Sequence, residues 1–171
     1  RGGAAIFWNS KLSTIASHVV GEFAITAKAM LLQQSSSFWL TTVYGPTEDS
    51  RKPDFLNELA RTAPPPSDPW LINGDFNLIY EARDKNNHHL YRGLMGMFRQ
   101  AIDNAGLKEI KCKNRRYTWS NERENPTVVS IDKFFCTSSW DDLFPSSVLM
   151  ATSTAVSDQC PLLLADAATP R

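Results

Sequence analysis

The sequence has no excess of charge of either sign, because 18 Lys and Arg residues balance 18 Asp and Glu residues. A balanced chain carries neither a polycationic arm nor an acidic tail, so its net charge points to no nucleic-acid partner. Apolar runs as long as the roughly 20 residues of a membrane span are also lacking. We therefore expect a soluble domain without a membrane partner.

Cysteine is scarce, with only Cys112, Cys136 and Cys160 among 171 residues. An odd number of cysteines without a CxxC pair argues against a disulfide framework and a structural zinc site. Reduced thiols indicate an intracellular location, nuclear or cytoplasmic. No basic segment followed by an apolar one begins the chain, so no signal peptide is expected, and the start at Arg1 indicates a part of a larger coding sequence.

Core-forming residues are plentiful, since 42% of the chain is hydrophobic and 11% aromatic. At this length one core can remove about 70% of the unfolded chain's surface from water. Residues 1–171 are therefore expected to form a single domain.

Short strand patterns outnumber helix patterns. Alternating or continuous apolar runs predict strands over residues 4–8, 14–20, 23–33, 37–44, 70–72, 117–120, 128–136, 148–151 and 162–164. Apolar residues at helical spacing predict helices over 48–62, from Leu94 to a stop at Gly106, and over 138–144. This mixture predicts an α+β sandwich with helices outside antiparallel strands.

Asp75 and Asn77 follow a buried-looking strand in the segment Gly74-Asp75-Phe76-Asn77. Alternation along an extended chain places both side chains on one side, where they could orient a water molecule or help to bind a hard cation. An Asx turn that ends the strand is the other reading of the same residues.

Three further places carry weaker signals. Asp132 lies inside an apolar strand pattern, where a carboxylate must be paired or face a site. Thr118 precedes a tryptophan in another strand pattern, and Asp158 and Gln159 lie in a polar turn between two strands. A basic stretch that contains Lys113, Arg115 and Arg116 could contact phosphates, or could be a solvated loop.

In chain order, GGAAIFW, VYGP, WLINGDFN, YTWSN, SIDKFF and SDQCPLLL resemble the endonuclease/exonuclease/phosphatase superfamily with its DNase I-like fold. The sequences of these motifs are most similar to those of the apurinic-type endonuclease domain of plant LINE-type (non-LTR) retrotransposons. The resemblance covers nearly the whole chain. It implies a four-layered αββα sandwich, here without its N-terminal strands, and a metal-dependent phosphodiesterase that acts on DNA.

The resemblance also implies roles for individual residues. Asp75 corresponds to the carboxylate that aligns the attacking water, and Asn77 to the residue that orients it and the phosphate. Asp132 corresponds to the carboxylate that pairs with the family's histidine. The other implied roles are Asp158 near a Mg²⁺ or Mn²⁺ ion held together with Asp75, phosphate contact by Tyr44, and contact of Thr118 with the scissile phosphate or a flanking nucleotide.

Two departures from the family pattern predict impaired catalysis. Gln159 stands where the family has histidine, and an amide cannot carry a proton charge near neutral pH. The strands that bear the family's first Asn and its metal-binding Glu do not precede Arg1. We expect little nuclease activity from the chain as given, no rescue by Gln159→His alone, and a tendency to associate through an uncovered sheet edge.

Two alternatives remain open at this stage. One is a non-catalytic phosphate- or nucleic-acid-binding module, or an inert relic. The other is a phosphatase of the same superfamily that acts on a small phosphate ester. By resemblance, a reverse transcriptase domain in the same coding sequence is an expected partner.

Overall fold

The computed structural model describes residues 2–121, 123–152 and 160–167. Its strands are β1 (Ser13–Val20), β2 (Ala24–Leu31), β3 (Ser36–Tyr44), β4 (Trp70–Asp75), β5 (Lys108–Glu109), β6 (Trp119–Ser120), β7 (Val128–Val129), β8 (Asp132–Cys136), β9 (Ser147–Ala151) and β10 (Leu162–Asp166). Its helices are α1 (Lys52–Thr62), α2 (Arg92–Asn104) and α3 (Ser138–Leu143), with short 3-10 turns at Asp49–Arg51 and Ala82–Asp84.

A six-stranded mixed sheet is the centre of the molecule. Its strands lie in the order β1-β2-β3-β4-β8-β5, and only the β3–β4 pair is parallel. The parallel pair is joined through α1, as a crossover connection requires. β9 pairs with β10, and β6 with β7, in two separate two-stranded ladders.

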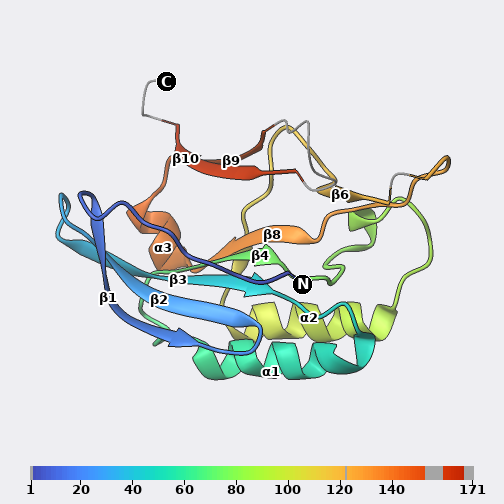
Figure 1. Ribbon diagram of the computed structural model, residues 1–171, viewed down its shortest axis with the longest axis horizontal. Coiled ribbons are helices and arrows are strands. Elements are labelled where there is room, and N and C mark those ends of the chain that lie inside the picture. Colours follow the sequence, from blue (N-terminus) through green and yellow to red (C-terminus); the bar gives the residue numbers. More distant parts are fainter. Residues whose placement is uncertain (1, 122, 153–159, 168–171) are drawn as a thin grey trace.

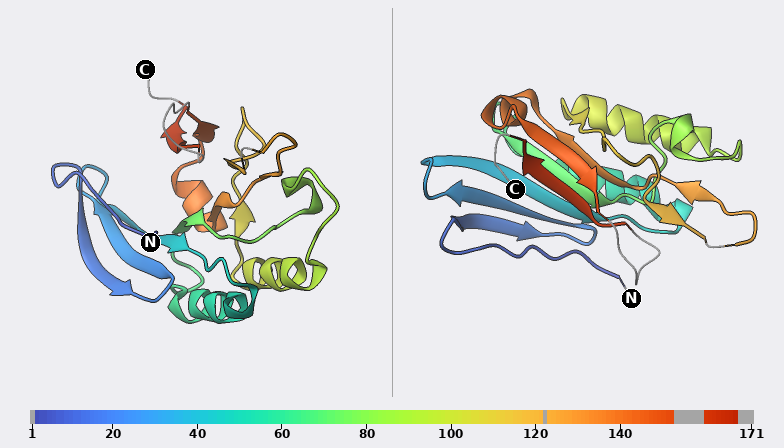
Figure 2. Two further views of the ribbon diagram at one scale, coloured as in Figure 1. Left: turned by 45° about the vertical axis from the view of Figure 1, so that its right-hand side comes forward. Right: turned by 90° about the horizontal axis from the view of Figure 1, so that it is seen from above.

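Helices α1 and α2 lie side by side on one face of the sheet (Figures 1 and 2). Both helices are amphipathic and turn aromatic and aliphatic side chains onto the sheet. Phe55 of α1 and Phe98 of α2 meet Phe76 and Phe135 there, and all four are fully buried. Ring centroids 5.1–6.1 Å apart join these four side chains into one aromatic core.

The other face of the sheet is covered by α3 and by the β9–β10 pair (Figure 1). A second cluster joins Leu71 and Phe134 of the sheet to Trp140 of α3 and Leu149 of β9. The α+β class is confirmed. Within the described residues the second layer of strands facing this sheet consists of β9 and β10.

Glu58 of α1 connects the helix layer to the β1–β2 hairpin. Its carboxylate accepts backbone N–H bonds from Glu22, Phe23 and Ala24 at 2.9–3.0 Å, and the residue is 6% exposed. Three amide donors replace the water that the carboxylate loses on burial. One side chain therefore caps the turn between two strands.

The strand predictions needed three corrections. Residues 4–8 form no strand, and Phe7 is 92% exposed. The predicted strand over 128–136 is two strands, because Ser130 N–H donates to Asp84 O and leaves the ladder. The short strand β5 at Lys108–Glu109 had no sequence signal.

No helix in the described ranges is long and apolar enough for a membrane span.

Candidate active site

Polar side chains gather at one end of the central sheet, on the face opposite α1 and α2. Tyr44, Asp75 and Asp132 are register partners on the neighbouring strands β3, β4 and β8. Partners in register project from the same face of a sheet. The sequence predictions for these three residues therefore converge on one row of side chains.

A second polar row lies one pleat further into the sheet. Thr42 Oγ1 donates to Asn73 Oδ1 at 3.0 Å. A cavity of about 370 Å³ opens over this row and over Asp132, and Cys160 and Pro161 line it as well. Sequence reasoning missed Asn73, although it lies two residues before Asp75 and shares its face.

Asn77 is held against Asp75 by the turn that ends β4. Asn77 N–H donates to Asp75 Oδ1 at 2.8 Å, and Asn77 Nδ2 donates to Asp75 Oδ2 at 3.1 Å and to Gly45 O at 2.8 Å. Asn77 adopts φ +49°, a left-handed conformation that asparagine tolerates better than most residues. The Asx turn is thus present, and it brings the two predicted site residues together.

The surroundings of Asp75 raise the pKa of its carboxyl group. Burial raises the pKa of its carboxyl to about 6, the bond from Asn77 N–H opposes this shift, and the charge of Asp132 adds to it. Two carboxylates in one site disfavour each other's ionised form. Near neutral pH this group can take a proton from water or be stabilised by a cation.

Thr118 holds the chain beside Asp132. Its Oγ1 accepts N–H bonds from Ile131 and Asp132 at 3.2 Å each, and Cys160 N–H donates to its backbone oxygen. The residue is only 6% exposed. The structure therefore places Thr118 at the site as a buried support for Asp132, whereas direct substrate contact stays a prediction.

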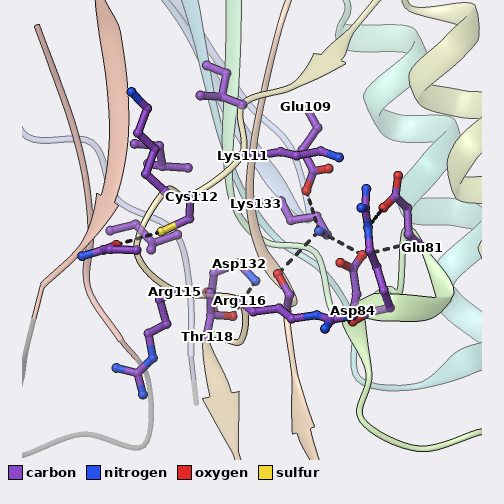
Figure 3. A pocket seen from close by; sticks show the side chains of 17 residues that line it. Glu81, Asp84, Glu109, Lys111, Cys112, Arg115, Arg116, Thr118, Asp132 and Lys133 are labelled. Atoms are coloured by element: carbon purple, nitrogen blue, oxygen red, sulfur yellow. Dashed lines mark hydrogen bonds and ion pairs between the residues drawn. The ribbon is translucent and has the colours of Figure 1, made fainter. Parts of the chain in front are cut away.

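The predicted basic residues line a separate, larger cavity of about 620 Å³ that also reaches Thr118 and Asp132 (Figure 3). Lys113, Arg115 and Arg116 all lie on its wall. All three are exposed, and their contact with phosphates stays a prediction.

Sequence reasoning missed a buried ionic cluster on the opposite face of β8. Lys133 Nζ lies 3.0 Å from Asp84 Oδ2 and 2.7 Å from Glu109 Oε1, and its side chain is 2% exposed (Figure 3). A lysine inside an apolar strand must find carboxylates, and this requirement was the signal in SIDKFF. We name Lys133, Asp84 and Glu109 the buried triad.

The donor set fits a weakly held divalent cation. Asp75 and Asp132 supply carboxylates and Asn73 or Asn77 an amide oxygen, while Mg²⁺ usually needs one or two carboxylates plus substrate oxygens. Within residues 2–121, 123–152 and 160–167, no group of three or more His, Cys, Asp or Glu residues is placed to hold a metal ion. Asp158 and Gln159, two other predicted site residues, lie outside the described residues.

No protein-family model matches the chain, and no curated protein matches it. Solved structures do match. The endonuclease domain of TRAS1, a telomere-specific non-LTR retrotransposon, aligns with a TM-score of 0.64 and 13% identity over 85% of this chain. An AP endonuclease from Archaeoglobus fulgidus aligns with a TM-score of 0.63 and 15% identity over 91%.

An endonuclease/exonuclease/phosphatase from Bacteroides vulgatus aligns with a TM-score of 0.55 and 13% identity over 92% of this chain. The chain spans 64%, 71% and 67% of these three structures, respectively. At such identities the likeness concerns the backbone arrangement. The chain has the DNase I-like fold of the endonuclease/exonuclease/phosphatase proteins.

Proposed function

We propose that this chain is part of a divalent-metal-dependent endonuclease of the retrotransposon type, which hydrolyses a phosphodiester bond in DNA with reduced efficiency. The observation that carries the proposal is the row of Tyr44, Asp75 and Asp132 with Asn77 held against Asp75. The endonucleases among the solved structures with this fold support a nucleic-acid substrate.

Asp75 is the proposed residue that aligns the attacking water by accepting a hydrogen bond from it. In the metal-free chain burial raises the pKa of this carboxyl to about 6, which makes it a stronger hydrogen-bond acceptor than an exposed aspartate. Asn77 Nδ2 donates to Asp75 and to Gly45 O, which orients the amide oxygen for a hydrogen bond from the same water. Tyr44, the register neighbour of Asp75, would donate its hydroxyl to a phosphate oxygen.

Asp75 and Asp132 would hold a Mg²⁺ or Mn²⁺ ion. When bound, such an ion supplies positive charge that stabilises the negative charge developing on the phosphate. The two carboxylates among the described residues imply weak binding of the ion and therefore a slow reaction.

Gln159 is a second reason for reduced efficiency. An amide donates hydrogen bonds but cannot supply a proton or a charge near neutral pH. Losing such a group commonly costs about 10²–10⁴ in rate. We therefore expect Gln159→His alone to leave the rate low, because an imidazole does not add a metal-binding carboxylate.

Plasmid nicking in Mg²⁺ or Mn²⁺ tests the proposal. The chain should nick supercoiled DNA slowly, Asp75→Asn should abolish nicking, and the exposed Asp142→Asn should leave it unchanged. Equal nicking by Asp75→Asn and the unmodified chain would show that the Asp75 row does not catalyse the reaction. DNA binding without any nicking, even at high metal concentration, would favour a non-catalytic binding module.

A further inference from the structure

The large cavity of about 620 Å³ is lined by Thr118 and Asp132, but not by Asp75 or Tyr44. Figure 3 shows the charged side chains on its wall. Besides Asp132, its acidic residues are Glu81, Asp84 and Glu109. The basic residues on its wall are Arg83, Lys111, Lys113, Arg115, Arg116 and Lys133. Which of these charges remain available decides what the cavity can bind.

Two cations of the wall pair with three of its four acids, so one negative charge of these three stays uncompensated. Lys133 Nζ contacts Asp84 Oδ2 at 3.0 Å and Glu109 Oε1 at 2.7 Å. Arg83 Nε pairs with the carboxylate of Glu81. Because the Lys133 side chain is only 2% exposed, water screens the interactions within the triad poorly.

Four cations are left over. Lys111, Lys113, Arg115 and Arg116 form no ion pair with any residue that the structure describes. Two of them are nevertheless oriented: Arg116 Nε donates to Arg83 O at 3.0 Å, and Arg115 Nη1 donates to Cys160 Sγ at 3.2 Å. Each guanidinium keeps further N–H groups for a ligand.

We propose that this cavity binds consecutive phosphates of one nucleic-acid strand without a metal ion, and that Lys133 of the buried triad offsets part of the negative charge in its wall. The proposal deepens the proposed function by naming a subsite beside the cleaved phosphate. Several cations along a hollow match a charged backbone that repeats its phosphates. We assign the hollow of about 620 Å³ to one strand, because the two phosphate backbones of a duplex are held apart across a major groove about 12 Å wide.

Fluorescence anisotropy in EDTA measures this binding apart from catalysis. The probe is a fluorescein-labelled single-stranded DNA oligonucleotide, with the same sequence as a duplex in a second arm. Arg115→Gln combined with Arg116→Gln should raise the Kd about tenfold and reduce the salt slope by about 1.4, the effect of two lost contacts to a single strand.

The matched control is Lys11→Gln combined with Arg61→Gln, which removes the same charge at exposed positions outside the cavity. It should change the Kd less than twofold. Equal losses in both double variants would overturn the proposal, because binding would then follow net charge alone. Tighter binding of the duplex than of the single strand would overturn the assignment to one strand.

Glu109→Gln tests the role of the triad in the opposite direction. It removes one negative charge from the wall, so binding should tighten about two- to threefold. Structural damage would weaken binding instead, and therefore an unchanged or weaker affinity would contradict the role given to the triad. Circular dichroism confirms that each variant is folded.

The two proposals can fail separately. Loss of binding in the Arg115/Arg116 variant without nicking by any variant would leave the cavity as a binding site and refute the endonuclease. Nicking that depends on Asp75, with binding indifferent to Arg115 and Arg116, would refute the cavity and leave the endonuclease.

Discussion

Two neighbouring residues of β8, Asp132 and Lys133, show opposite solutions to burying carboxylates. On one face Asp132 lies in register with Asp75, and burial together with the charge of Asp132 raises the Asp75 pKa to about 6. On the other face Lys133 compensates Asp84 and Glu109 within 3.0 Å. The chain places an internal lysine between one pair of acids, whereas the other pair is suited to a proton or an external cation.

The largest effect is expected from removing the internal cation. Lys133→Met leaves Asp84 and Glu109 buried without their partner, and breaking a buried pair costs about 3–5 kcal/mol of unfolding free energy. The matched control is Lys108→Met, whose pair with Asp141 has side chains 51% and 45% exposed. Its loss should cost under about 1 kcal/mol.

Urea unfolding at neutral pH compares the two lysine variants. Similar losses would mean that the triad is no more protected from water than a surface pair, and the contrast between the two faces of β8 would disappear. Lys133→Arg, which keeps the charge, should retain more stability than Lys133→Met.

A smaller effect of opposite sign is expected from Asp75→Asn. The folded-state pKa of Asp75 is about 6, against an ordinary value of 3.8. A carboxyl whose pKa is raised by folding favours the folded state while protonated, and that advantage is lost as pH rises from about 4 to above 6. The variant should therefore be more stable than the parent by about 1–2 kcal/mol at pH 7.5, a figure reduced for partial exposure.

At pH 3.5 the stability gain of Asp75→Asn should vanish. Thermal melts at both pH values measure the difference, with the exposed Asp142→Asn expected to change stability by less than about 0.5 kcal/mol. A gain that is the same at both pH values would show that ionisation of Asp75 is not its source.

The smallest effect is expected from the electrostatic interaction between Asp132 and Asp75, measured as a change in the Asp75 pKa. Asp132→Asn should lower the Asp75 pKa only part of the way to its ordinary value, because burial is the largest cause of the shift and Asp132 a lesser one. Carbon-13 NMR of the aspartate carboxyl groups measures this titration. An unchanged Asp75 pKa would separate the two residues into independent sites.

The sequence predicted the local parts of this site better than the long-range ones. Asp75 and Asn77 are two residues apart, so alternation and turn propensity alone placed them together. The break between β7 and β8 could not be predicted, because it depends on bonds from Ser130 to Asp84 and from Ile131 and Asp132 to Thr118.

The same reasoning explains the missed triad. Asp132 was identified as the carboxylate that needed an explanation, whereas the fully buried charge of the strand is Lys133, whose partners lie 49 and 24 positions earlier in the chain. Sequence patterns show that a charge needs a partner, but the topology of the sheet decides which one it meets.

The hydrogen bonds of Glu58 also affect which part of the molecule unfolds locally. A single carboxylate fastens the turn at Glu22, Phe23 and Ala24, while the outer strand β1 pairs only with β2 in the described sheet. When the hydrogen bonds to the Glu58 carboxylate break, the amide protons of Glu22, Phe23 and Ala24 lose their protection from solvent exchange together. The turn and the edge strand β1 are therefore expected to open first, whereas Phe23, whose ring centroid lies 5.7 Å from that of Phe55, joins the start of β2 to the aromatic core.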